Sequence, residues 1–310
     1  MPVCSEDVLW ILPSTVNSAP ADPSAAGDRD NVGASVDSGA SVGEDNPRAS
    51  WYAEPIQRTV GQIESMDSES CRWIGQDGRR RTFNADLVLA FRHRSDDPDT
   101  VALVEALDRE DFDAAFAALP AALRTRPPVH AQQDWVMQTA RLAWATGRLG
   151  GAEGLISQLD ARPLPPCVVA KLPLVWVPPN DATTLTRLRS IAAPEDGLRS
   201  PLVRLLRAAA MVHSGRSIEA NEILMPLRRQ TSRADIRALA IWVSVAAMTP
   251  NDFRDQADAW VRNLDEETPV VLSDGPRRLL IRRLSDIGRD SDARRLAVID
   301  RYAWVNVPPP

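Results

Sequence analysis

Lysine is nearly absent from this 310-residue chain, and cysteine is rare. Lys171 is the only lysine, so all but one of the 36 basic residues are arginine. The three cysteines, at positions 4, 71 and 167, are too few and too scattered for a disulfide scaffold or a CxxC-type zinc site. No apolar run approaches the ~18 residues that a membrane helix needs, so we expect no transmembrane segment.

No motif for catalysis or cofactor binding lies in the context that its chemistry needs. The one GxSxG match, at 39–43, lies in a stretch rich in Ser, Ala, Asp, Gly and Pro, whereas a nucleophile elbow joins a strand to a helix. The glycine-rich stretch 147–154 follows a predicted helix and holds no lysine, which excludes a P-loop. The three histidines, His93, His130 and His213, are never three or four residues apart. A metal site needs ligands at such spacings or gathered by the fold. We therefore predict that the chain is not an enzyme, binds no metal and uses no cofactor.

The formal net charge of −6 comes from one end of the chain. Residues 1–50 hold eight acidic residues and two arginines, which leaves the remainder close to neutral. Nucleic-acid-binding domains are usually basic, so nucleic acid is not an expected partner. The same segment lacks the basic and apolar regions of a signal peptide. We expect a cytoplasmic protein, or an exported one if the true start lies upstream.

The first 50 residues have the composition of a disordered segment. Residues 13–50 are dominated by Ser, Ala, Asp, Gly and Pro and show no apolar periodicity, so they cannot bury enough surface to offset the entropy of ordering. We predict a disordered acidic tail over 1–50. The apolar run 8–12 within it is either a short strand or a docking segment.

Residues 51–94 have the character of strands. Short apolar or β-branched runs lie at 59–66, 71–74, 81–83 and 87–91. Gln76-Asp77-Gly78 lies between the second run and the third. It is typical of a tight turn, because glycine accepts a positive φ. These runs predict a small antiparallel β-module, SH3-like, that packs on the helices after it.

From about residue 98 to residue 304 the sequence is helical in pattern. Gly, Pro, Asn, Asp or Ser punctuates nearly every junction, and the short links imply antiparallel neighbours. A proline-rich insertion at 162–180 interrupts the pattern and is expected to lie on the helices. After a helix that begins near 99, we predict helices at about 112–124, 130–147, 150–160, 182–191, 200–214, 217–230, 232–248, 251–264, 274–287 and 290–302.

A small turn residue followed by alanine five positions later recurs in this region. The pairs are Gly147 with Ala152, Gly215 with Ala220 and Gly288 with Ala293, and two weaker copies are Glu110 with Ala115 and Asp252 with Ala257. The turn positions lie 37, 68, 37 and 36 residues apart, and the long gap leaves room for one degenerate unit. Glycine suits the left-handed backbone at a helix end, and alanine lets two helices approach closely.

These pairs make residues 98–303 resemble the tetratricopeptide-repeat (TPR) class, whose period is near 34. The family's early Trp and mid-helix Tyr are replaced, by Val136 and Ala143 in one unit and by Arg204 and Met211 in another. The resemblance implies a mainly α fold, a right-handed α–α superhelix preceded by the β-module and the tail. It also implies a non-enzymatic scaffold or adaptor that binds a protein or peptide partner.

The resemblance further implies which residues meet the partner. In this family the first helix of each pair lines a concave groove. The residues carried over to that groove are Met137, Arg141, Trp144, Trp242, Arg278, Arg282 and Ser285. A groove lined by Arg and Trp would suit an extended acidic or C-terminal peptide, because guanidinium pairs with carboxylate in a bidentate manner.

One alternative function rests on the C-terminal helices. Residues 271–310 contain eight arginines and five aspartates, a local net charge of +3. An RNA- or phosphate-binding helical-repeat protein would need such a basic surface. Binding that weakens with salt would favour this alternative, and peptide binding with little salt dependence would favour the adaptor.

Overall fold

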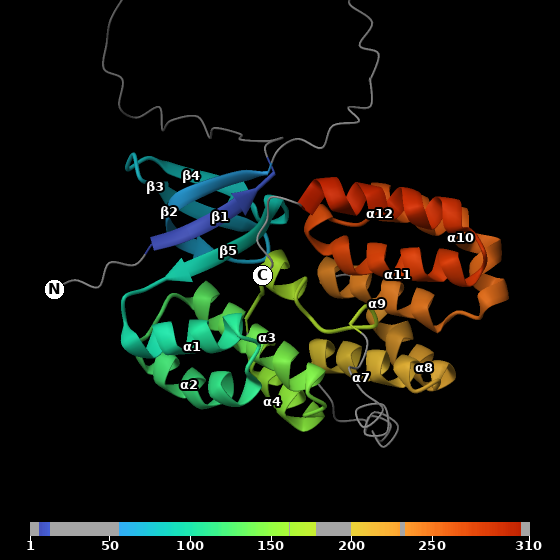
Figure 1. Ribbon diagram of the computed structural model, residues 1–310, viewed down its shortest axis with the longest axis horizontal. Coiled ribbons are helices and arrows are strands. Elements are labelled where there is room, and N and C mark those ends of the chain that lie inside the picture. Colours follow the sequence, from blue (N-terminus) through green and yellow to red (C-terminus); the bar gives the residue numbers. More distant parts are fainter. Residues whose placement is uncertain (1–5, 13–55, 161, 178–199, 230–232, 305–310) are drawn as a thin grey trace, which may run out of the picture.

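The computed structural model describes residues 6–12, 56–160, 162–177, 200–229 and 233–304 (Figure 1). The protein is mainly helical, with a small antiparallel sheet at its N-terminal end. Within these ranges, no helix combines the length and the apolar composition needed to cross a membrane. The tail predicted beyond residue 12, the helix predicted at 182–191 and the end of the predicted insertion lie outside the described residues.

Five strands form the sheet in the order β4-β3-β2-β1-β5, and all neighbouring strands are antiparallel. The strands are β1 (Glu6–Ile11), β2 (Gln57–Met66), β3 (Ser70–Gly75), β4 (Arg80–Asn84) and β5 (Val88–Arg94), with the 3-10 helix η3 (Ala85–Leu87) before β5. Gly78 has a φ of +73° in the turn between β3 and β4. An L side chain would be strained there, which explains the glycine.

Strand β1 lies in the interior of the sheet, between β2 and β5 (Figure 1). Every residue of the strand after Glu6 is buried. A strand that is covered on both faces does not alternate apolar and polar residues, which explains the unbroken apolar run at its centre. The domain boundary predicted at residue 50 is therefore wrong, because it separates β1 from the other strands of the same sheet. The apolar run that begins at residue 8 belongs to a strand of the β-module.

Eleven α-helices and one further 3-10 helix are described. The helices are α1 (Pro98–Asp108), α2 (Phe112–Arg124), α3 (Val129–Ala145), α4 (Leu149–Leu159), α5 (Pro166–Val169), α7 (Pro201–His213), α8 (Ser217–Arg228), α9 (Ala234–Ala247), α10 (Pro250–Glu266), η4 (Val270–Leu272), α11 (Asp274–Asp286) and α12 (Asp290–Trp304). Consecutive helices pack closely as α1 with α2, α3 with α4, α7 with α8, α8 with α9, and α11 with α12. Short connections produce these antiparallel pairs.

Four of these pairs turn through a residue with left-handed backbone. Gly147, Gly215 and Gly288 have φ of +73°, +80° and +80°, and Glu110 has φ of +53°. After Gly147 the N–H of Arg148 donates to the carbonyl of Ala143 at 2.8 Å, and the other three turns have the same bond. This is the Schellman motif, which satisfies carbonyls that a helix end leaves unpaired.

Asp252 differs from the other four predicted turn residues. It lies in the first turn of α10, where its N–H donates to the side chain of the N-cap Thr249. The alanine of this copy is buried like the others; the five buried alanines are Ala115, Ala152, Ala220, Ala257 and Ala293. The turn between α9 and α10 is therefore built by a capping threonine and Pro250 instead of a left-handed residue.

The helices form an arc around the sheet and the segment 163–177 (Figure 1). Helix α5 of that segment packs on β5, η3, α3 and η4, and η4 in turn contacts β5 and η3. The sheet therefore contacts the helical region at two places, near α3 and near η4. At these two places the sheet and α5 cover the inner side of the arc.

The segment 163–177 is an internal part of the structure. Its buried residues are Leu164, Pro165, Pro166, Cys167, Val168, Val169, Leu172, Pro173, Leu174 and Val175. Gln133 donates to the carbonyl of Pro163 at 3.3 Å, and Arg282 donates to the carbonyl of Val175 at 3.2 Å. The segment therefore connects α3 to α11. The expectation that it lies on the surface of the helices is wrong, because most of its residues are buried between other elements.

Candidate functional site

Three of the predicted groove residues are part of the core. Met137, Trp144 and Trp242 are 0, 1 and 1 % exposed. Helix α3, which carries the first two, packs against β2 and α5, whereas Trp242 lies beside Trp260 and donates to Thr268 at 3.0 Å. The expectation that these three side chains meet a partner is therefore wrong, because other parts of the same chain cover them.

The other four predicted groove residues keep some exposure. Arg141 is half-buried, and Arg278, Arg282 and Ser285 are exposed. Arg278 pairs with Asp274 at 3.1 Å on its own helix. Since Arg282 binds the segment 163–177, it already has an acceptor within the chain. Arg141 lies on α3, whereas the other three lie on α11.

The arginines of the C-terminal helices also bind groups of their own chain. Arg283 donates to the carbonyl of Met248 at 2.7 Å and lies over the Phe253 ring. Arg289 pairs with Asp258 and Asp292, both at 2.7 Å. Guanidinium groups held in this way are poorly placed for phosphate, which needs free donors.

The fold brings together three residues that are remote in sequence: Asp7, His93 and His130. The register of β1 and β5 places Asp7 directly opposite His93, and Asp7 Oδ1 lies 2.6 Å from His93 Nδ1. The other oxygen, Oδ2, accepts the N–H of Ile63 in β2 at 2.7 Å. His130, in the first turn of α3, places Nε2 3.8 Å from Asp7 Oδ1. We call these three residues the Asp–His–His cluster.

The Asp–His–His cluster is enclosed by apolar surface. Asp7, His93 and His130 are 2, 7 and 2 % exposed. The Phe91 ring meets the His130 ring edge-on at 5.3 Å between centroids, and the Trp135 ring lies 5.9 Å from His93. Electrostatic interactions are stronger in such surroundings than in water.

Asp7 is ionised in this environment. Burial opposes its ionisation, but the imidazoles of His130 and His93 and the N–H of Ile63 outweigh that effect and lower the pKa of Asp7 to about 2. His130 Nε2, in contrast, has no hydrogen-bond partner among the described residues. The cluster thus presents a carboxylate and two imidazole nitrogens, with ligand atoms within 4.8 Å of one another, which can hold a metal ion.

The buried thiols offer no reactive group beside this cluster. Burial raises the pKa of Cys71 and of Cys167 to about 12. A protonated thiol is a poor nucleophile and a poor metal ligand. These two cysteines therefore act as small core residues.

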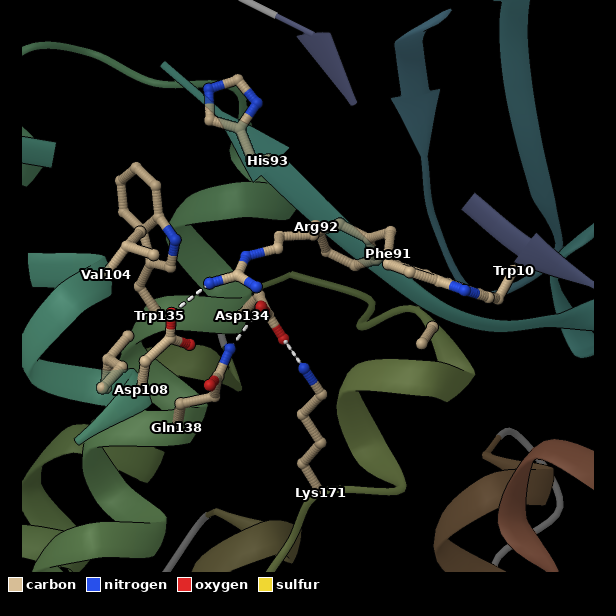
Figure 2. Close-up of a pocket in the computed structure, with 12 residues that line it drawn as sticks. Trp10, Phe91, Arg92, His93, Val104, Asp108, Asp134, Trp135, Gln138 and Lys171 are labelled. Atoms are coloured by element: carbon tan, nitrogen blue, oxygen red, sulfur yellow. Dashed lines mark hydrogen bonds and ion pairs between the residues drawn. The ribbon is translucent and has the colours of Figure 1, made fainter. Parts of the chain in front are cut away.

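A cavity of about 70 Å³ lies next to the cluster, between β5, α1 and α3 (Figure 2). Its aromatic walls include Trp10, Phe91 and Trp135. Figure 2 shows Arg92 extending toward Asp108, whereas the ring of His93, the next residue of β5, points away from Arg92. His93 also lines the cavity, so the cavity and the Asp–His–His cluster share this residue.

The charges that line the cavity are paired. Lys171 Nζ lies 2.6 Å from Asp134 Oδ1, and Gln138 donates to Asp134 Oδ2 at 2.7 Å (Figure 2). Arg92 of β5 pairs with Asp108 of α1, and both residues line the cavity. Two cations thus face two carboxylates, and the lining as a whole is neutral.

Reasoning from the sequence missed both sites. Asp7 fell in the predicted tail, the two histidines were judged too far apart for a metal site, and Lys171 lay in the predicted insertion. A charged residue directly before the apolar run of β1 is a weak signal for a buried role. Only the pairing of β1 with β5, across 80 or more residues of sequence, brings Asp7 to His93.

Comparisons with known proteins add no relative: no protein-family model, no curated protein and no solved structure matches the chain.

Proposed function

We propose that the protein is a non-enzymatic interaction module that docks a segment of a partner protein. Its framework is a TPR-like right-handed superhelix of helical hairpins around an SH3-like sheet. The recurrent left-handed turns at Gly147, Gly215 and Gly288, each followed by a buried alanine, support this framework. Stacked hairpins of this kind commonly serve as binding scaffolds.

The cavity between β5, α1 and α3 is the proposed docking point, and its size is the observation that carries the proposal. Sites for small molecules and cofactors measure roughly 300–1,000 Å³. The cavity measures about 70 Å³, which suits one inserted side chain instead of a metabolite. Protein interfaces gain most of their affinity from a few side chains buried in such aromatic-lined pockets.

The pairing of the lining charges indicates a neutral occupant. Arg92 and Lys171 each have a carboxylate partner, so an acidic guest would have to displace Asp108 or Asp134. An extended partner segment that inserts Leu, Met or Gln avoids this cost. Binding should then depend little on salt, because no net charge is neutralised.

The RNA- or phosphate-binding alternative has weaker support. Helices α11 and α12 carry the basic residues it would use, but Arg278, Arg283 and Arg289 are held by groups of their own chain. No cluster of free guanidinium groups is formed by the described side chains of these two helices.

A peptide library displayed on phage, selected on the full chain, tests the docking proposal. Val104→Phe fills the cavity from α1, and we expect it to weaken the enriched peptides at least about tenfold, which is about 1.4 kcal/mol. Arg141→Ala, on α3 but outside the cavity lining, is the matched control and should leave affinity within about twofold. Equal binding by the Val104→Phe variant, or no enrichment at all, would contradict the proposal.

A further inference from the structure

His130 Nε2 is one of the buried polar atoms in the described core that lack a hydrogen-bond partner, and it lies beside a carboxylate and a second imidazole. The side chain is 2 % exposed, and Nε2 has no hydrogen-bond partner among the described residues. It faces Asp7 Oδ1 at 3.8 Å, which is too long for a hydrogen bond. A buried imidazole nitrogen without a partner lowers stability unless a further group satisfies it.

We propose that Asp7, His93 and His130 bind a divalent transition-metal ion, with zinc as the best fit. Two imidazole nitrogens and one carboxylate oxygen are the donors that zinc and its first-row neighbours prefer. Calcium and magnesium require six or more oxygen ligands, which this cluster does not offer. Three protein ligands leave one tetrahedral position for water.

The observed distances are close to those that zinc needs. Zinc bonds of about 2.0–2.2 Å place neighbouring tetrahedral ligand atoms about 3.3–3.5 Å apart. The two measured separations from Asp7 Oδ1 are 2.6 Å to His93 Nδ1 and 3.8 Å to His130 Nε2. Binding therefore requires one of these separations to open and the other to close, each by less than about 1 Å, and it requires the two imidazole nitrogens, which lie within 4.8 Å of each other, to reach a similar spacing.

The surroundings already orient the ligands. Asp7 Oδ2 is held by the N–H of Ile63, which leaves Oδ1 directed at both histidines. Such outer hydrogen bonds fix the orientation of ligating carboxylates. His93 must present an unprotonated Nδ1 to the metal, so its ring then carries its proton on Nε2.

The three ligands come from β1, β5 and α3, so a bound ion would tie two neighbouring strands of the sheet to the helical region. Metal binding by ligands that only the folded chain assembles adds to folding stability. We therefore expect zinc to raise the melting temperature of the protein by about 3 °C or more.

The test uses the full chain without a histidine tag, stripped with EDTA and titrated with zinc chloride. The chain has only three histidines, which makes their imidazole nitrogens resolvable by NMR. We expect zinc to shift the signals of His93 Nδ1 and His130 Nε2 and to leave those of His213 unchanged. A titration in which His93 and His130 keep their signals would overturn the proposal, whether or not zinc binds elsewhere.

Variants provide the second measurement. After gel filtration, the wild type and the control His213→Gln should each retain about one zinc ion per chain, and His130→Gln and Asp7→Asn should bind at least about tenfold more weakly. Circular dichroism establishes that each variant is folded. Zinc retention by folded His130→Gln equal to that of the wild type would overturn the proposal. If His130→Gln does not fold, the NMR titration of the wild type decides.

Discussion

Among single residues, the buried charges show most clearly how one side chain depends on another. Lys171, the only lysine, and Asp134 are 9 % and 6 % exposed and lie 2.6 Å apart. Neither charge has access to enough water to be stable alone. The pair therefore holds the segment 163–177 against α3 only as long as both members are present.

Lys171→Met should lower the free energy of unfolding by about 3 kcal/mol, because it leaves the Asp134 carboxylate buried without its cation. The double variant Lys171→Met with Asp134→Leu should be clearly more stable than the single variant, since it removes both charges. Urea unfolding measures both effects. A double variant less stable than Lys171→Met alone would contradict this account of the pair.

His213 predicts a dependence of stability on pH. Burial, and then the nearby Arg282, lowers the pKa of His213 below its ordinary value of 6.5. The unfolded chain therefore takes up this proton at a higher pH than the folded chain does. The contribution of neutral His213 to the free energy of unfolding is complete above about pH 6.5, and it is lost as the pH falls through the pKa of the folded state.

The melting temperature should accordingly fall more steeply from about pH 7 to pH 5 in the wild type than in His213→Gln. Thermal unfolding by circular dichroism at several pH values gives the two slopes. Parallel slopes would show that His213 does not contribute in this range.

At the scale of elements, the turns between helices depend on backbone conformation more than on packing. Gly215 has a φ of +80°, yet a Cβ placed on it would meet nothing within 4 Å. The cost of a side chain there is therefore backbone strain alone. Gly150, inside α4, has equally open surroundings but ordinary helical backbone, which makes it the matched comparison.

Gly215→Ala should lower the free energy of unfolding by about 1 kcal/mol, whereas Gly150→Ala should raise it by about 0.5–1 kcal/mol. Chemical denaturation of the two variants measures the difference in sign. The same sign for both would contradict the left-handed turn at Gly215.

The elements also show what the sequence can and cannot predict. Helix positions and the turns at Gly147, Gly215 and Gly288 follow from local rules, since a helix end and a left-handed glycine are set within a few residues. The place of β1 was missed because its partners, β2 and β5, lie beyond residues 13–55. The Asp–His–His cluster was missed for the same reason. The spacing of residues within a segment does not predict which strands pair or in what register.

At the scale of the whole molecule, the segment 163–177 fastens the parts of the arc together. Near its end the half-buried Trp176 lies against Gly275 of α11, where a Cβ would come within 2.3 Å of the Trp176 ring. Glycine is therefore required at position 275, because the Trp176 ring approaches the backbone too closely for a side chain. This contact, together with the bond from Arg282 to Val175, links the C-terminal hairpin to the centre of the protein.

Gly275→Ala should destabilise the protein by about 1–3 kcal/mol, because the Trp176 ring must move to admit the methyl group. Adding Trp176→Leu should relieve part of that loss, and Trp176→Leu alone serves as the reference. Differential scanning calorimetry measures all three variants. Additive losses in the double variant would contradict a direct clash between the two residues.

The inner side of the arc is covered by other parts of the chain, which limits where a partner could bind. Met137, Trp144 and Trp242 were predicted to line an open groove, but the sheet and neighbouring helices bury them. That error arose because the pattern of helical hairpins says nothing about which other part of the chain covers them. We propose that a partner segment docks instead at the cavity between β5, α1 and α3.

Photo-crosslinking tests that claim most directly. A peptide enriched on the full chain, carrying a benzophenone at its inserted side chain, is irradiated in complex with the protein, and the linked residues are identified by mass spectrometry. We predict links to Val104 of α1 and Gln138 of α3, which line the cavity. Links confined to α11, at Arg278 or Ser285, would contradict the account and restore the groove.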